Sequence, residues 1–183
     1  SYCYAAKHPG RLMGLIVEDI TAGSSVKGAG SERIRREMAA LPTGFAGWAA
    51  ARAYWRALRP NVSDAAIEER LFESMCADAE GRVGWRYDAA GIAATRMAPD
   101  PARVVDLHPV IEAIRTATLV IRGGRSDFCE LAKVRELEGR NPVLTHATVA
   151  KASHYVHDNA PETFARLVEG FLAGLQACHA GRC

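Results

Sequence analysis

Short runs of consecutive apolar residues constrain the fold of this chain more than any other feature. Residues 12–17 are apolar at every position except Gly14, and residues 117–124 read ATLVIRGG. A run of strand length that is apolar at successive positions predicts a strand buried on both faces, as in parallel sheets. Residues 143–149 form a third segment suited to a strand. The three segments together predict a parallel sheet.

The segment between the first and second predicted strands has a different pattern. In residues 31–97 apolar side chains recur at spacings of three and four, which is typical of helices. Ser63 and Asp88 stand where helix caps are expected, and no convincing long strand is present. We therefore expect residues 31–97 to form a helical insertion between two strands of the sheet.

Helical patterns also follow the second and third predicted strands. One covers residues 127–138, and Pro161 is well suited to be the first residue of a last helix. Strands that alternate with helices predict the α/β class, with helices on the faces of a parallel sheet. Residues 1–30 and 98–183 would form this sheet-containing core.

Length and composition limit the classes of protein that this chain can belong to. It has 183 residues, 49% of them hydrophobic, and a formal net charge of +2. A core of this size suits one domain, and so small a charge gives no electrostatic reason to expect nucleic acid or an anionic membrane as partner. The five cysteines form no CxxC pair, and the chain does not open with a signal segment. We therefore expect neither a disulfide framework nor a four-cysteine metal site, and a cytoplasmic location.

Three titratable residues follow the predicted strands at the point where each strand ends. Asp19 ends the first strand, Asp127 follows the second, and His154 follows the third. Carboxyl ends of parallel strands meet at one edge of the sheet, where ligand chemistry gathers. An acid followed in sequence by a histidine matches one order found in nucleophilic hydrolases, in which the carboxylate orients the imidazole and the imidazole takes a proton.

Each of these residues also has a structural interpretation. Asp127 would serve equally well as a helix cap, and Asp19 is better explained by binding neighbouring loop amides. A lone histidine such as His154 usually has no catalytic role, and His157 competes with it for that role. Cys129 is better explained as a small buried residue than as a nucleophile, because no histidine-paired motif supports it. The aromatic residues at helical spacing in the insertion favour packing over a substrate pocket: Trp48, Tyr54, Trp55 and Trp85.

Both ends of the chain resemble the α/β-hydrolase family. The segment TATLVIRGGRSDF and the later segment VLTHATVAKASHYVHDNAPETFARLVEGFL look like its carboxyl-terminal part, and AAKHPGRLMGLIVEDI looks like the helix behind the nucleophile and the sixth strand. The resemblance implies that Asp127 is the acid and His154 the histidine of a catalytic triad. It also implies that residues 31–97 form a helical lid.

The nucleophile of that family is absent from the chain. No G-x-S-x-G elbow is present, and the resemblance places it roughly half a dozen residues before Ser1. The three predicted strands are also too few for a complete sheet of this type. We therefore expect this chain to be the carboxyl-terminal part of a longer hydrolase or an incomplete gene product, without turnover of its own.

The resemblance implies hydrolysis of an ester or related bond of a small-molecule substrate, without a metal or an organic cofactor. An upstream Ser would attack, with His154 as general base and Asp127 orienting it. An Asp nucleophile would instead form an alkyl-enzyme ester. Two further alternatives stay open, namely a non-catalytic remnant or binding module, and a lidded relative that performs carbon–carbon cleavage or cofactor-free oxygenation.

Overall fold

The computed structural model describes residues 1–23, 28–98, 100, 102, 104–179 and 181. The chain divides into two compact units, which are described separately below. Unit 1 comprises Ser1–Glu32 and Val105–Cys183, and unit 2 comprises Arg33–Val104. The second unit therefore corresponds closely to the predicted helical insertion, residues 31–97.

Unit 1 contains a three-stranded sheet whose strands are all parallel. Strands β1 (Leu15–Glu18), β4 (Thr118–Gly123) and β5 (Leu144–Val149) lie in the order β1-β4-β5. The prediction of an α/β fold with a parallel sheet is thus confirmed. Strand β4 lies in the middle and is buried along its whole length. This explains why Leu119, Val120 and Ile121 are apolar at successive positions, whereas β5 at the side alternates more.

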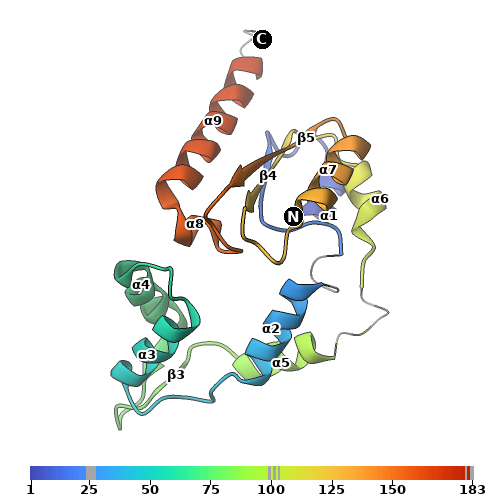
Figure 1. Ribbon diagram of the computed structural model, residues 1–183. Coiled ribbons are helices and arrows are strands. Elements are labelled where there is room, and N and C mark those ends of the chain that lie inside the picture. Colours follow the sequence, from blue (N-terminus) through green and yellow to red (C-terminus); the bar gives the residue numbers. More distant parts are fainter. Residues whose placement is uncertain (24–27, 99, 101, 103, 180, 182–183) are drawn as a thin grey trace. The chain divides into compact units, whose positions relative to one another are not determined.

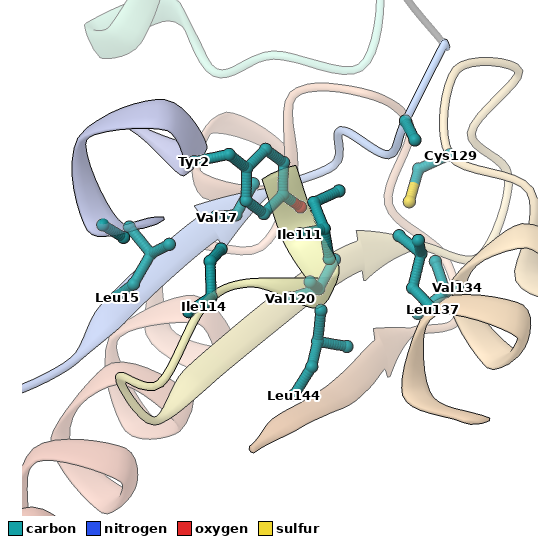
Figure 2. Packing of buried hydrophobic residues seen from close by; sticks show 12 residues of the cluster. Tyr2, Leu15, Val17, Ile111, Ile114, Val120, Cys129, Val134, Leu137 and Leu144 are labelled. Carbon is teal, nitrogen blue, oxygen red and sulfur yellow. The ribbon is translucent and has the colours of Figure 1, made fainter. Parts of the chain in front are cut away.

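Helices cover both faces of this sheet (Figure 1). Helices α1 (Tyr2–Lys7), α6 (Leu107–Glu112) and α7 (Leu131–Arg140) pack on one face, and α9 (Pro161–His179) packs on the other. Figure 2 shows the first of these two cores, in which side chains of all three strands meet those of the helices. This core consists of Tyr2, Ala5, Leu15, Val17, Ala22, Ile111, Ile114, Val120, Cys129, Val134, Leu137 and Leu144.

Residues of β4 supply both cores because their side chains alternate between the two faces. Val120 belongs to the core under α1, α6 and α7, whereas Leu119 and Ile121 belong to the core under α9. Burial of apolar surface on both sides contributes roughly 25 cal/mol per Å². The sheet is therefore stabilised by apolar packing on both of its faces.

Unit 2 contains helices and one small hairpin. Its helices are α3 (Trp48–Leu58), α4 (Asp64–Ser74) and α5 (Ala89–Met97), and α2 (Ala29–Ala39) begins in unit 1 and continues into unit 2. The predicted caps are confirmed, because Ser63 Oγ accepts a hydrogen bond from Ala66 N–H and Asp88 Oδ1 accepts one from Gly91 N–H.

The hairpin is a feature that the sequence analysis did not predict in full. Strands β2 (Met75–Ala77) and β3 (Val83–Trp85) pair antiparallel, and only the second was expected to be extended. Each strand has three residues, which is too short for a clear alternation of apolar and polar positions. The loop after β5 also differs from expectation, because it contains a short helix, α8 (Val156–Asn159).

Tyr54, Trp55 and Trp85 of unit 2 belong to its packed core, as predicted, whereas Trp48 is 39% exposed. Trp55 is buried, and its ring lies edge-on to Tyr54 and Trp85 with centroids 5.9 and 6.1 Å apart. Trp85 and Tyr87 also line a cavity of about 600 Å³ whose other walls are largely aliphatic. Trp85 therefore both packs against Trp55 and lines a pocket.

Two further observations concern the chain as a whole. Cys3, Cys76 and Cys129 are free thiols, whereas Cys178 is disulfide-bonded, which the spacing of the cysteines did not indicate. No helix in the described part of the chain combines the length and the apolar character needed to cross a membrane.

Candidate active site

The carboxyl edge of the sheet brings the loops after β1, β4 and β5 together. Glu18, the last residue of β1, is in register with Ile121 of β4, and Gly123 of β4 is in register with Val149 of β5. Asp19 therefore follows β1 directly beside the end of β4. The sheet places this acid and the loop that carries His154 at the same edge, as the sequence predicts.

His154 and Asp19 form a direct contact at this edge. His154 Nδ1 lies 2.8 Å from Asp19 Oδ2, although 135 positions separate the two residues in the sequence. The Asp19 side chain is fully buried, whereas the His154 side chain is 20% exposed. A carboxylate that accepts a hydrogen bond from Nδ1 leaves Nε2 as the basic nitrogen of the neutral ring. This is the arrangement that a histidine needs to take a proton from a nucleophile or from water.

The buried Asp19 carboxylate is compensated by hydrogen-bond donors. Gly123 N–H donates to Oδ1 over 2.8 Å, and the Ser126 hydroxyl donates to Oδ2, the oxygen that also contacts His154. A buried ionised carboxylate is tolerated only when such donors replace its hydration. All three donors belong to loops or strand ends that follow β4 and β5, so the acid connects the ends of all three strands.

The backbone of Asp19 adopts a conformation that few residues tolerate. Its φ is +51°, the one positive value at a non-glycine position among the described residues. Asp is enriched in this left-handed region, where bulkier side chains are strained. Asp19 N–H is nevertheless satisfied, since it donates to Ile121 O over 2.8 Å. Backbone strain of this kind often accompanies functional sites.

The imidazole of His154 packs against two aromatic rings. Its centroid lies 4.5 Å from that of Phe128 and 5.1 Å from that of Tyr155. Its loop is also anchored, because Ser153 donates both its N–H and its hydroxyl to Asn159 Oδ1. These contacts hold the ring in position, while 20% of the side chain stays exposed.

A tight glycine turn after β4 allows the loop of His154 to approach. A side-chain carbon at Gly123 would collide with the backbone carbonyl oxygens of Ala152 and Ser153, and one at Gly124 would collide with the backbone of Ala150. Only glycine fits such close backbone approach. The interpretation of Gly123-Gly124 as a turn therefore agrees with the structure.

The resemblance implies Asp127 as the acid of the triad, whereas the structure places Asp19, which follows β1 rather than β4, against His154 Nδ1. The role of Asp127 stays a prediction. Asp127 is half-buried, and its backbone carbonyl accepts a hydrogen bond from Gly30 N–H over 2.9 Å. The alternative that Asp127 caps a helix is wrong, because α7 begins only at Leu131 and has Glu130 as its cap residue.

The signal that distinguishes the two acids is weak in the sequence. Asp19 was expected to bind loop amides, and it does accept the Gly123 N–H, but it also contacts His154. Both acids follow an apolar strand, so position along the chain does not separate them. An acid directly after the last strand residue, without an intervening turn, lies closer to the neighbouring strand end, and this could have favoured Asp19.

His157, the competing histidine, contacts a different carboxylate. Its Nδ1 lies 2.8 Å from Glu18 Oε2, and its backbone N–H donates to Glu18 Oε1 over 3.0 Å. The imidazole of His157 is half exposed, and its Nε2 lies 3.3 Å from Asp158 Oδ1. Both of its ring nitrogens thus lie near carboxylates, in contrast to the single carboxylate at His154 Nδ1.

Cys129 lies close to the site but is unsuited to be a nucleophile. Its side chain is fully buried, and burial, reinforced by the nearby Asp19 charge and opposed by Arg122, raises the pKa of its thiol to about 12. The thiolate is the reactive form of cysteine, so this thiol is inert near neutral pH. In the described part of the chain no cluster of three or more His, Cys, Asp or Glu residues could hold a metal ion.

The fold of this chain is similar to the folds of solved hydrolase structures. No protein-family model matches the chain. The solved structure of E-2-(acetamidomethylene)succinate hydrolase is similar with a TM-score of 0.80 and 23% identity, over 94% of this chain and 62% of that one. An esterase from M. tuberculosis is similar with a TM-score of 0.72 and 23% identity, over 92% of this chain and 57% of that one.

A third similar structure is a peroxisomal alpha-beta-hydrolase from Saccharomyces cerevisiae. Its TM-score is 0.72 and its identity 15%, over 94% of this chain and 50% of that one. Identities this low carry the fold and not the activity. The chain spans 62% or less of the length of each of these three structures. The described residues therefore adopt the α/β-hydrolase fold, over the part of it that forms the carboxyl-terminal strands of the sheet.

Proposed function

We propose that this chain supplies the acid and the general base of a hydrolase that cleaves an ester or related bond of a small apolar substrate. The observation that carries the proposal is the contact between His154 Nδ1 and the buried Asp19 carboxylate at the carboxyl edge of a parallel sheet. The nucleophile would come from a segment before Ser1. Support for such a segment comes from the 62% coverage of the similar hydrolase structure.

The proposed chemistry proceeds in two steps. A serine hydroxyl attacks the substrate carbonyl while His154 Nε2 takes its proton, and the resulting imidazolium donates that proton to the leaving alcohol. Water then attacks the acyl-enzyme while His154 takes its proton, and the imidazolium returns that proton to the serine oxygen as the acid product leaves. Asp19 holds the ring in the tautomer with a proton on Nδ1 and stabilises the imidazolium. The proposal assigns no step to a metal or an organic cofactor.

Residues 31–97 are proposed as the helical lid of the hydrolase. The cavity lined by Trp85, Tyr87 and the aliphatic residues around them supports an apolar substrate. An Asp nucleophile remains an alternative, in which His154 would activate water against an alkyl-enzyme ester. A non-catalytic binding module with the same fold is the other alternative, and the experiment below separates all three.

The test uses the polypeptide encoded in the same reading frame with its upstream segment. We expect hydrolysis of p-nitrophenyl esters and labelling by a fluorophosphonate, with the rate reduced by about 10³-fold or more in His154→Ala. His157→Ala is the matched control, and its rate should stay within about threefold because its imidazole is held by Glu18.

The outcomes discriminate between the candidates. An Asp nucleophile predicts no fluorophosphonate labelling but turnover of alkyl epoxides or halides that depends on His154. A folded protein with neither activity would support the binding module and contradict the proposal. Hydrolysis that survives His154→Ala would contradict it as well.

A further inference from the structure

The hydroxyl of Ser126 takes part in three hydrogen bonds. It donates to Asp19 Oδ2, and its oxygen accepts the N–H groups of Phe128 over 3.0 Å and Cys129 over 3.2 Å. A serine hydroxyl has one proton to donate and two lone pairs with which to accept. Backbone N–H groups can only donate, so both lone pairs are used and the proton has one remaining target, Asp19.

Because both lone pairs of Ser126 Oγ are used, the direction of its hydrogen bond to Asp19 is fixed. Oδ1 accepts the Gly123 N–H, and Oδ2 accepts the Ser126 hydroxyl. An ionised Asp19 can accept from all of these groups, because each carboxylate oxygen has two acceptor sites. In that arrangement His154 Nδ1, 2.8 Å from Oδ2, carries the proton of their contact.

The same serine also places the ring that packs on the histidine. Phe128 donates its backbone N–H to Ser126 Oγ, and its ring centroid lies 4.5 Å from that of His154. One hydroxyl thus connects the acid on one side of the imidazole with the aromatic contact on its face. The sequence analysis assigned no role of its own to Ser126, which precedes Asp127 in the segment TATLVIRGGRSDF.

We propose that Ser126 is a positioning residue for the His154–Asp19 pair. By donating to the oxygen that accepts from His154, it fixes Asp19 as an acceptor and takes a share of the negative charge that would otherwise act on the imidazole. This inference rests on the proposed function for its catalytic meaning. The hydrogen-bond arrangement itself can be tested in the 183-residue chain, without a nucleophile.

The test is an NMR measurement of the imidazole protons and nitrogens of His154 in the ¹⁵N-labelled chain. We expect the neutral ring to carry its proton on Nδ1, with that proton shifted downfield by its bond to a carboxylate. In Ser126→Ala, Oδ2 loses one of its two donors, so its bond to His154 strengthens and the Nδ1 proton moves further downfield. Ser126→Thr keeps a hydroxyl and should restore the original position.

Controls separate this role from simple loop capping. Ser153→Ala removes a hydroxyl next to His154 that donates to Asn159 and not to Asp19, so it should leave the Nδ1 proton in place. If Ser126 only caps the Phe128 and Cys129 amides, Ser126→Ala will lower stability without moving the Nδ1 proton. That result would overturn the proposal.

A second variant keeps the test decisive if Ser126→Ala does not fold. Ser126→Cys preserves volume and has a weaker donor, so it predicts a smaller downfield movement in the same direction. An unchanged or upfield position in folded Ser126→Cys would contradict the proposal. A downfield movement in a protein whose longer form hydrolyses no ester would support the role of Ser126 in the hydrogen-bond network while contradicting the proposed function.

Discussion

Two histidine–carboxylate pairs stand side by side at the carboxyl edge of the sheet. Consecutive residues at the end of β1 provide the acids, and residues three apart in the loop after β5 provide the histidines. The two distances are the same, 2.8 Å for Asp19–His154 and 2.8 Å for Glu18–His157. Distance alone therefore does not separate a candidate catalytic pair from a structural one.

The surroundings of the two acids differ. Asp19 is fully buried and accepts from three parts of the chain, whereas Glu18 is 24% exposed and accepts from the backbone and ring of one residue, His157. The first arrangement connects all three strand ends, and the second fixes the start of α8. Burial and the origin of the donors distinguish the two pairs, and the predictions below test this distinction.

The largest expected contrast lies in the reactivity of two thiols. Burial and the Asp19 charge raise the pKa of Cys129 to about 12, so at pH 8 only about one molecule in ten thousand carries its thiolate. We expect iodoacetamide to modify the exposed Cys76 at least about 10³-fold faster in the folded chain. Mass spectrometry of digested samples would measure both rates. Similar rates in folded protein would show that the region around Asp19 is open to solvent.

The next largest effect should follow substitution in the turn that supports Asp19. Gly123→Ala places a carbon against the carbonyl oxygens of Ala152 and Ser153. We expect it to lower the free energy of unfolding by about 2–3 kcal/mol, measured by urea denaturation. Gly139→Ala in α7 is the matched control, since no atom lies near the added carbon, and it should raise stability by up to about 1 kcal/mol. Equal effects would mean that the turn does not require glycine.

Neutralising the buried acid should cost less than the glycine substitution but remain measurable. In Asp19→Asn one carboxylate oxygen becomes an NH₂ group, which then faces a donor instead of accepting from one. An unsatisfied buried donor of this kind costs about 1–3 kcal/mol, which urea denaturation would detect. A change below the error of that measurement would contradict the account of Asp19 as an acceptor from three donors.

The smallest effect is expected at the exposed pair. Glu18→Gln removes the charge that faces His157, and exposed ion pairs contribute only about 0–1 kcal/mol. The loss should shrink further in 1 M salt, where screening reduces exposed charge interactions. A loss as large as that of Asp19→Asn, or one that salt does not change, would remove the distinction between the two pairs.

Much of the fold could be predicted because apolar runs mark the buried strands and cap residues mark the starts of helices. The run at residues 117–124 becomes β4, and Ser63 and Asp88 cap helices as expected. The hairpin of β2 and β3 could be predicted only in part, since three-residue strands carry almost no periodicity.

The position of the candidate site at the sheet edge and its histidine could be predicted from the sequence. The carboxylate that contacts this histidine could not. Asp19 and Asp127 both follow apolar strands, and the order acid then histidine fits either. The choice depends on the left-handed backbone of Asp19, the register of β1 with β4, and the hydroxyl of Ser126. These are properties of three-dimensional packing, which spacing along one chain does not contain.

The central claim is that Asp19 is the acid that serves His154. The most direct measurement compares kcat for ester hydrolysis by Asp19→Asn and Asp127→Asn, both made in the protein that includes its upstream segment. We predict a loss of about 10²–10⁴-fold in kcat for Asp19→Asn with little change in KM, and a smaller loss for Asp127→Asn. The reverse order, with Asp127→Asn inactive and Asp19→Asn near the original rate, would contradict the account.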